Sequence, residues 1–199
     1  MTTVAYFFSP QSPWTYFGHR RFHDIARRHE AAIEVLPVDL GGKVFPVSGG
    51  LPLGQRPPQR QAYRLLELQR FAEHLQLPLN LKPTFFPVAG DAAARLIVAV
   101  GSGDGADAAM GIAEALMRAV WVEQRNIADE ATLAALLRER ELSARRLDDA
   151  HGPSVQERYE ANTQRAIEAG VFGAPSYVID GEIFWGQDRL DFVERALAR

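Results

Sequence analysis

Two hydroxyl side chains, Ser12 and Thr15, stand where an apolar run gives way to an amphipathic pattern, in the stretch "FFSPQSPWTYFG". Ser12 precedes Pro13, and this pair suits the start of a helix, because Ser caps free N–H groups and Pro fits the first helical position. A helix cap is therefore one interpretation of Ser12. The other is chemical, since a helix N-terminus attracts anions and a hydroxyl there donates a hydrogen bond to one.

The chain contains no cysteine. This excludes disulfides, thiolate metal sites and thiol chemistry by the protein itself. A hydroxyl cannot shuttle electrons, but it can donate a hydrogen bond to the thiolate of a ligand. If Ser12 does so, the thiol must arrive with that ligand, and we expect glutathione.

Two other motifs resemble known sites but lack a required part. His19 and His23 have the i, i+4 spacing of metal ligands, but no third ligand accompanies them, so we expect surface histidines and no metal site. The run "GSGDGAD" at 101–107 lacks the Lys-Ser/Thr of a phosphate-binding loop, which favours a turn between helices.

Composition limits the class of protein. The 199 residues are 47% hydrophobic and 10% aromatic, which predicts one compact domain, or a domain with a large insertion, around a substantial core. A net charge of −3 argues against a general nucleic-acid partner. No stretch approaches the roughly 20 apolar residues of a membrane span, and "MTTVAYFFSP" lacks the basic start of a signal peptide. We therefore expect no membrane partner and a cytoplasmic location.

The first forty residues predict a right-handed βαβ unit: strand 4–8, helix 13–28 and strand 33–38. The Gly- and Pro-rich segment 41–60 is expected to be loop. The apolar spacing then predicts a block of helices, around 65–75, 92–100, 112–120, 129–140 and 154–169.

The last thirty residues return to strands. Asp180-Gly181 between two apolar runs predicts a hairpin, and a helix follows. Asp188 is the expected N-cap of that helix, with Asp191 at the N3 position of a capping box.

This order of βαβ, helices and ββα predicts an α/β fold, a thioredoxin-like four-stranded sheet with a large α-helical insertion, as in DsbA-like proteins. The thioredoxin-like part comprises 1–48 and 165–199, and the insertion comprises 49–164. Ala174-Pro175 precedes a strand, where this fold has a cis proline. The backbone before that proline then pairs with a peptide ligand like an added strand.

Four segments carry a family resemblance: "SPWTYFGHRRF", "PVDLGGKVFP", "AYRLLELQRFAEHLQLPLNLKPTFFP" and "GVFGAPSYVIDGEIFWGQDRLDFVERAL". They are similar to 2-hydroxychromene-2-carboxylate isomerases, which are related to kappa-class glutathione transferases and DsbA-like proteins. The resemblance covers nearly the whole chain, and the last segment is the most specific.

The resemblance implies a homodimeric, glutathione-dependent isomerase of naphthalene-type aromatic catabolism. It would interconvert 2-hydroxychromene-2-carboxylate and trans-o-hydroxybenzylidenepyruvate. The site residues it implies fall into three groups: Ser12 at the glutathione sulfur; Ala174, Pro175, Trp185, Gly186, Gln187 and Asp188 around glutathione; Lys43 and Phe85 in the substrate pocket.

The chain departs from the family at the first strand, where "YFFSPQSP" replaces a Tyr-Phe-Asp-Phe run before a single Ser-Pro. Either Ser9 or Ser12 can therefore face the sulfur, and the helix start favours Ser12. Two other functions stay open: a kappa-like glutathione transferase, and a non-catalytic glutathione-binding scaffold.

Overall fold

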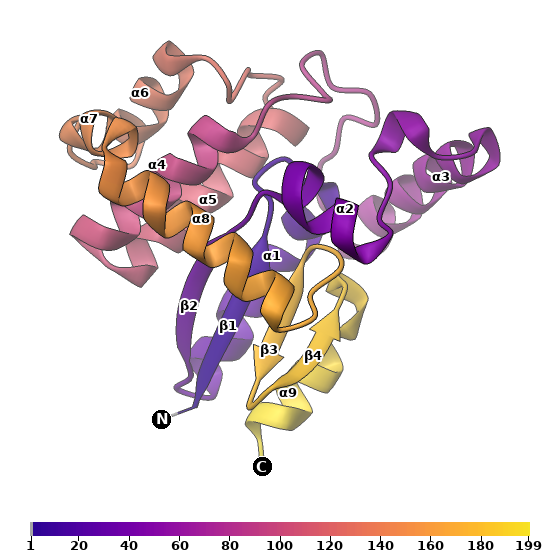
Figure 1. Cartoon of the computed structure of the whole chain (residues 1–199). Coiled ribbons are helices and arrows are strands. Elements are labelled where there is room, and N and C mark those ends of the chain that lie inside the picture. Colours follow the sequence, from indigo (N-terminus) through magenta and orange to yellow (C-terminus); the bar gives the residue numbers. More distant parts are fainter. Residues whose placement is uncertain (1) are drawn as a thin grey trace.

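A computed structural model describes residues 2–199 and contains one four-stranded sheet, in the order β2-β1-β3-β4 (Figure 1). β1 (Thr3–Phe8) runs parallel to β2 (Ala32–Pro37). β3 (Ser176–Ile179) pairs antiparallel with β1 and, through a hairpin at Asp180-Gly181, with β4 (Glu182–Trp185). The four-stranded sheet with a helical insertion that the sequence predicts is confirmed.

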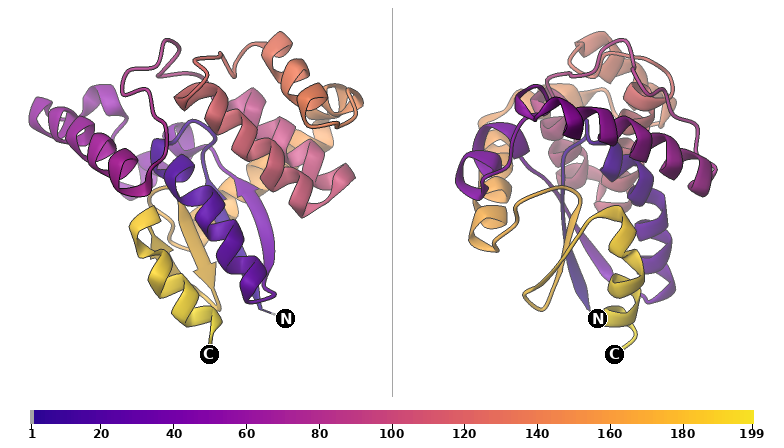
Figure 2. Two further views of the ribbon diagram at one scale, coloured as in Figure 1. Left: turned by 180° about the vertical axis from the view of Figure 1, so that it is seen from behind. Right: turned by 90° about the vertical axis from the view of Figure 1, so that its right-hand side faces the viewer.

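Helices cover both faces of this sheet. Figure 2 shows α1 (Pro13–Arg28) and α9 (Leu190–Leu197) on one face and α8 (Pro153–Glu168) on the other. The remaining elements lie between β2 and α8 in the chain: the π-turn Leu40–Val44, α2 (Phe45–Ser48), the 3-10 turn Leu53–Gln55, α3 (Pro58–Leu75), α4 (Asp91–Asp104), α5 (Ala106–Trp121), α6 (Glu130–Glu139) and α7 (Arg145–His151).

β1 has apolar side chains on both faces because helices bury both faces. Val4, Tyr6 and Phe8 belong to the core shared with α1, while Ala5 and Phe7 belong to the core shared with α8. A continuous apolar run, rather than an alternating one, is what a strand covered on both sides requires.

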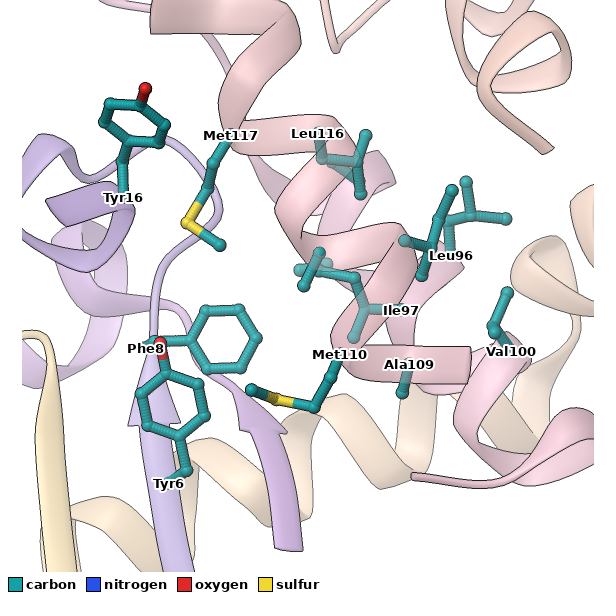
Figure 3. Packing of buried hydrophobic residues seen from close by; sticks show 14 of the residues in the cluster. Tyr6, Phe8, Tyr16, Leu96, Ile97, Val100, Ala109, Met110, Leu116 and Met117 are labelled. Atoms are coloured by element: carbon teal, nitrogen blue, oxygen red, sulfur yellow. The ribbon is translucent and has the colours of Figure 1, made fainter. Parts of the chain in front are cut away.

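The helical insertion shares the main core with the sheet. Figure 3 shows Tyr6 and Phe8 of β1 extending toward Met110 of α5, with Ile97 of α4 beyond. Tyr6 also stacks on Tyr177 of β3, with ring centroids 5.3 Å apart. The sheet and the insertion are therefore held together by one contiguous apolar cluster, and the predicted boundary at 164/165 lies inside α8.

Several local predictions need correction. The segment 41–60 is not simply loop, because it forms the π-turn, α2 and the 3-10 turn before α3 begins at Pro58. Pro at a first helical position favours such short helical turns as much as a loop. Within 101–107, the predicted turn between helices is Gly105 alone, because residues 101–104 are the last turn of α4 and α5 begins at Ala106. The helix α7 was not predicted.

His19 is buried rather than exposed, which corrects the prediction of a surface histidine. Its Nε2 lies 3.0 Å from the Met110 carbonyl oxygen, and its Nδ1 lies 3.0 Å from the Tyr6 hydroxyl. The carbonyl can only accept, so Nε2 carries the proton and Nδ1 accepts from Tyr6. Burial lowers the pKa of His19 to about 4, and the ring is neutral at pH 7.

Gly18 permits close packing between α1 and the C-terminal segment. A Cβ added there would lie 2.8 Å from the Tyr177 hydroxyl oxygen and 2.9 Å from Cβ of Gln187. Real Cβ atoms do not approach other heavy atoms so closely. Gly18 therefore sets the distance between α1 and the turn that follows β4.

No helix within residues 2–199 combines the length and the apolar character needed to cross a membrane.

Candidate active site

Ser12 is the N-cap of α1, as predicted. Its backbone is extended (φ −78°, ψ 125°), Pro13 occupies the first turn, and its Oγ accepts a hydrogen bond from the Thr15 N–H at 3.3 Å. Accepting this bond leaves the hydroxyl proton of Ser12 available to donate elsewhere. Thr15 is fully buried, with no partner for its Oγ1 among the described residues, so of this pair of hydroxyls only Ser12 reaches the solvent side.

Ser12 opens into a cavity of about 470 Å³. Four segments form its walls: the start of α1, the segment 40–56 with its short helical turns, the first turns of α3 with the 86–87 segment, and the chain around Ala174. The lining residues are Ser9, Gln11, Ser12, Pro13, Trp14, Leu40, Gly41, Phe45, Ser48, Gly49, Gly50, Leu51, Pro52, Leu53, Arg56, Arg60, Arg64, Phe86, Pro87, Phe172, Gly173, Ala174 and Trp185. Both Ser9 and Ser12 are among them, and only Ser12 stands at the helix N-terminus.

The peptide bond between Ala174 and Pro175 is cis, as predicted. Ala174 lines the cavity, and neither its N–H nor its carbonyl bonds to another backbone group within residues 2–199. Pro175 is buried behind it, and its carbonyl accepts the Gly186 N–H at 2.9 Å. An unpaired backbone edge beside a cavity is what an extended peptide ligand requires.

Trp185 forms the wall next to this edge. Its ring lies 4.8 Å from that of Phe172, and both side chains are about half exposed. A Cβ at Gly173 would clash with Trp185 Nε1, so the indole packs directly against the backbone there. Gly173 thus allows the close approach of Trp185 at the cavity wall.

The next three predicted residues lie just outside the residues that line the cavity. Gly186 has φ +104°, a conformation that favours glycine. Gln187 is buried, and its Oε1 accepts from Arg21 Nη1 of α1 at 2.9 Å. Its side chain is therefore committed to the protein interior.

Asp188 is not the N-cap of α9, which corrects the prediction. It lies inside a 3-10 turn, Gln187–Arg189, and α9 starts at Leu190 without a side-chain cap. The turn at Gly186 adds this 3-10 segment before the helix, so the capping pattern of Asp188 and Asp191 falls out of register. The Asp188 carboxylate is 45% exposed, and its Oδ2 lies 3.1 Å from Arg189 Nη1.

The two predicted substrate residues do not line the cavity of Ser12. Lys43 lies in the π-turn and lines a separate cavity, between that turn, α4 and α8, together with Asp91 and Arg95. Phe85 is 42% exposed, whereas its neighbour Phe86 lines the Ser12 cavity.

Three arginines that line this cavity, Arg56, Arg60 and Arg64, were not predicted as site residues. Their spacing of four residues carried a usable signal, because residues four apart share a helix face. Trp14 and Phe172 were missed as well; nothing in their local sequence separates them from core aromatics.

Residues 3–198 match the family model of the DSBA-like thioredoxin domain. A 2-hydroxychromene-2-carboxylate isomerase of Pseudomonas putida is 30% identical over 98% of this chain and 94% of its own length. The chain belongs to this isomerase family, within the DSBA-like thioredoxin domains. A family relative from Sphingobium xenophagum is 28% identical over 98% of this chain and 97% of its own.

Solved structures agree with this family in fold. A structure of 2-hydroxychromene-2-carboxylate isomerase superposes with a TM-score of 0.81, at 24% identity, covering 99% of this chain and 95% of that one. The cytosolic disulfide reductase DsbM of Pseudomonas aeruginosa gives a TM-score of 0.69 at 21% identity, covering 98% of each chain. Since the chain has no cysteine, it shares the fold of the reductase without the thiols that disulfide chemistry requires.

Proposed function

We propose that this protein is a glutathione-dependent isomerase that interconverts 2-hydroxychromene-2-carboxylate and trans-o-hydroxybenzylidenepyruvate. The observation that carries the proposal is the hydroxyl of Ser12, which caps α1 and opens into a cavity walled by aromatic side chains and by the free backbone of Ala174. The 30% identical relative, whose name states this isomerase activity, supports the same conclusion. The proposal places the reaction in naphthalene-type aromatic catabolism in the cytoplasm.

The residues present fit glutathione. The unpaired N–H and carbonyl of Ala174 suit the central residue of a tripeptide, because an extended backbone pairs with both groups. Trp185 supplies an apolar wall beside them. Asp188, in the 3-10 turn that follows Trp185, has a half-exposed side chain that is available to the free ammonium of the γ-glutamyl end.

When bound, glutathione supplies a thiolate that adds transiently to the substrate double bond, so that rotation about the resulting single bond precedes its departure. The protein's part is to hold that thiolate. The Ser12 hydroxyl donates a hydrogen bond to it, and the free N–H groups at the start of α1 add the positive end of the helix dipole. Both effects favour the charged form and lower the pKa of the thiol.

The rest of the cavity suits a planar aromatic substrate. Trp14, Phe45 and Phe86 line it together with the arginines of α3. Flat aromatic walls orient a bicyclic ring and exclude water, while cationic groups attract its carboxylate.

The test is to mix purified protein with 2-hydroxychromene-2-carboxylate, with and without glutathione, and to follow substrate, product and free thiol. Turnover that requires glutathione but does not consume it is the expected result. Stoichiometric thioether formation would instead establish a kappa-like transferase. Glutathione binding with neither reaction would establish a non-catalytic scaffold, and both outcomes would refute the proposal.

A further inference from the structure

Arg56, Arg60 and Arg64 form a cationic cluster on one wall of the Ser12 cavity. Arg60 and Arg64 lie one turn apart in α3, and Arg56 lies four residues before Arg60, just ahead of the helix. Arg60 is exposed at the rim, Arg56 is partly buried, and Arg64 is only 9% exposed. The cluster therefore runs from the mouth of the cavity into its interior.

No carboxylate among residues 2–199 pairs with any of these three guanidinium groups. Some other arginines are neutralised by carboxylates: Arg146, for example, bonds both Asp104 and Asp149. Burial and the charge of Arg56 lower the pKa of Arg64 to about 10, so Arg64 is still charged at pH 7. A largely buried, uncompensated charge of this kind calls for an anion.

The structure also fixes the orientation of the cluster. The Arg64 guanidinium lies over the rings of Phe86 and Trp121, at 5.3 Å and 5.9 Å from their centroids. Arg56 donates its Nε proton to the Leu51 carbonyl at 2.8 Å, which leaves its terminal nitrogens free. Ring stacking does not use the N–H groups of Arg64, so these remain available to a planar acceptor.

We infer that Arg56, Arg60 and Arg64 form the subsite that binds the carboxylate of a planar aromatic carboxylate substrate. Arg64 supplies the buried contact, and Phe86 lies against the ring. The inference rests on the proposed function for the identity of the substrate. It assigns these arginines to the substrate pocket, where the sequence resemblance had implied Lys43, which lines another cavity.

The experiment measures binding of chromone-2-carboxylate, a stable bicyclic carboxylate, and of its neutral methyl ester by calorimetry. The proteins are the wild type, Arg64→Gln, Arg60→Gln and Arg70→Gln, all with saturating glutathione. Arg70 is the matched control, because it is an exposed residue of α3 that does not line the cavity. Arg60→Gln keeps the test valid if loss of the buried Arg64 unfolds the protein, since Arg60 is exposed.

We expect the wild type and Arg70→Gln to bind the acid at least tenfold more tightly than the ester. Arg64→Gln should lose most of that preference, and Arg60→Gln part of it. Equal acid affinity in all four proteins would overturn the inference, as would failure of the wild type to bind the acid.

Glutathione affinity, measured separately, distinguishes the two carboxylate ligands. If Arg64→Gln weakens glutathione binding and leaves the acid unaffected, the cluster binds glutathione and the inference is wrong. If the wild type binds the acid through these arginines but does not isomerise 2-hydroxychromene-2-carboxylate, the subsite stands and the proposed function fails.

Discussion

Replacement of Ser12 separates its two roles, helix cap and thiolate donor. Ser12→Ala removes the acceptor of the Thr15 N–H and the hydroxyl that faces the cavity. The cap bond is long, at 3.3 Å, so its loss should lower the free energy of unfolding by about 0.5 to 1 kcal/mol. For a chain of this size, that corresponds to about 1 to 4 °C in melting temperature.

The effect on bound glutathione should be larger. A hydrogen bond to a charged group contributes about 1.5 to 3 kcal/mol. Its loss should raise the pKa of the bound thiol by about 1 to 2 units, since one unit corresponds to 1.36 kcal/mol. Turnover at neutral pH should then fall by about tenfold to a hundredfold, because less thiolate is present.

Ser12→Asp is the matched variant. Asp caps helices about as well as Ser, so the melting temperature should not fall. Its negative charge should still raise the pKa of the bound thiol. The assay is the ultraviolet absorption of the thiolate in the complex as a function of pH, read beside turnover and thermal unfolding.

One result would refute this reasoning. If Ser12→Ala retains the low thiol pKa and normal turnover, while Ser9→Ala loses both, Ser9 is the donor and Ser12 is only a cap.

Four further predictions concern stability, binding and assembly. The pKa of His19 is lowered to about 4, so the folded protein binds this proton at lower pH than the unfolded chain does. The resulting stabilisation is present above pH 6.5 and is lost as pH falls toward 4. Urea titrations should show the free energy of unfolding decreasing by about 3 kcal/mol over that range, and His19→Gln should abolish the decrease. Gly18→Ala should lower the free energy of unfolding by about 1 to 3 kcal/mol through its clash. Gly101→Ala, whose added Cβ would meet only the Cβ of Ala109 at an ordinary 3.4 Å, should be neutral or stabilising; a harmless Gly18→Ala would disprove the close approach. Asp188→Asn should leave the melting temperature unchanged but weaken glutathione binding about tenfold in calorimetry, and equal affinity would move the γ-glutamyl site elsewhere. The protein should sediment as a homodimer at micromolar concentration, and a mass near 22.1 kDa would contradict this.

The elements of the sheet could be predicted because each is encoded locally. The apolar run of β1, the Ser12-Pro13 helix start and the Asp180-Gly181 hairpin all lie within a few residues of what they determine. The burial of His19 could not be predicted from the same window, because its partners Tyr6 and Met110 lie 13 and 91 residues away.

The site residues also divide into those that local sequence predicts and those that depend on tertiary packing. Ser12 and Ala174 followed from positions that the fold fixes: a helix start and a cis proline. The arginine cluster depends on how α3 is placed against the start of α1, and that placement is set by contacts such as Trp14 with Phe71. The prediction for Asp188 was wrong because the spacing of Asp188 and Asp191 fits a capping box equally well whether or not a 3-10 turn precedes the helix.

The pairing of β1 with β3 has a consequence for synthesis on the ribosome. Ala5 pairs with Val178, so β1 is synthesised long before β3, its partner strand. Contacts this distant in sequence form slowly, because closing the intervening loop is entropically unfavourable. During elongation, β1 therefore presents an open hydrogen-bonding edge and an apolar surface, a state in which nascent chains are prone to aggregate. Chains that terminate before β3 should be insoluble or depend on chaperones, although they contain the whole helical insertion.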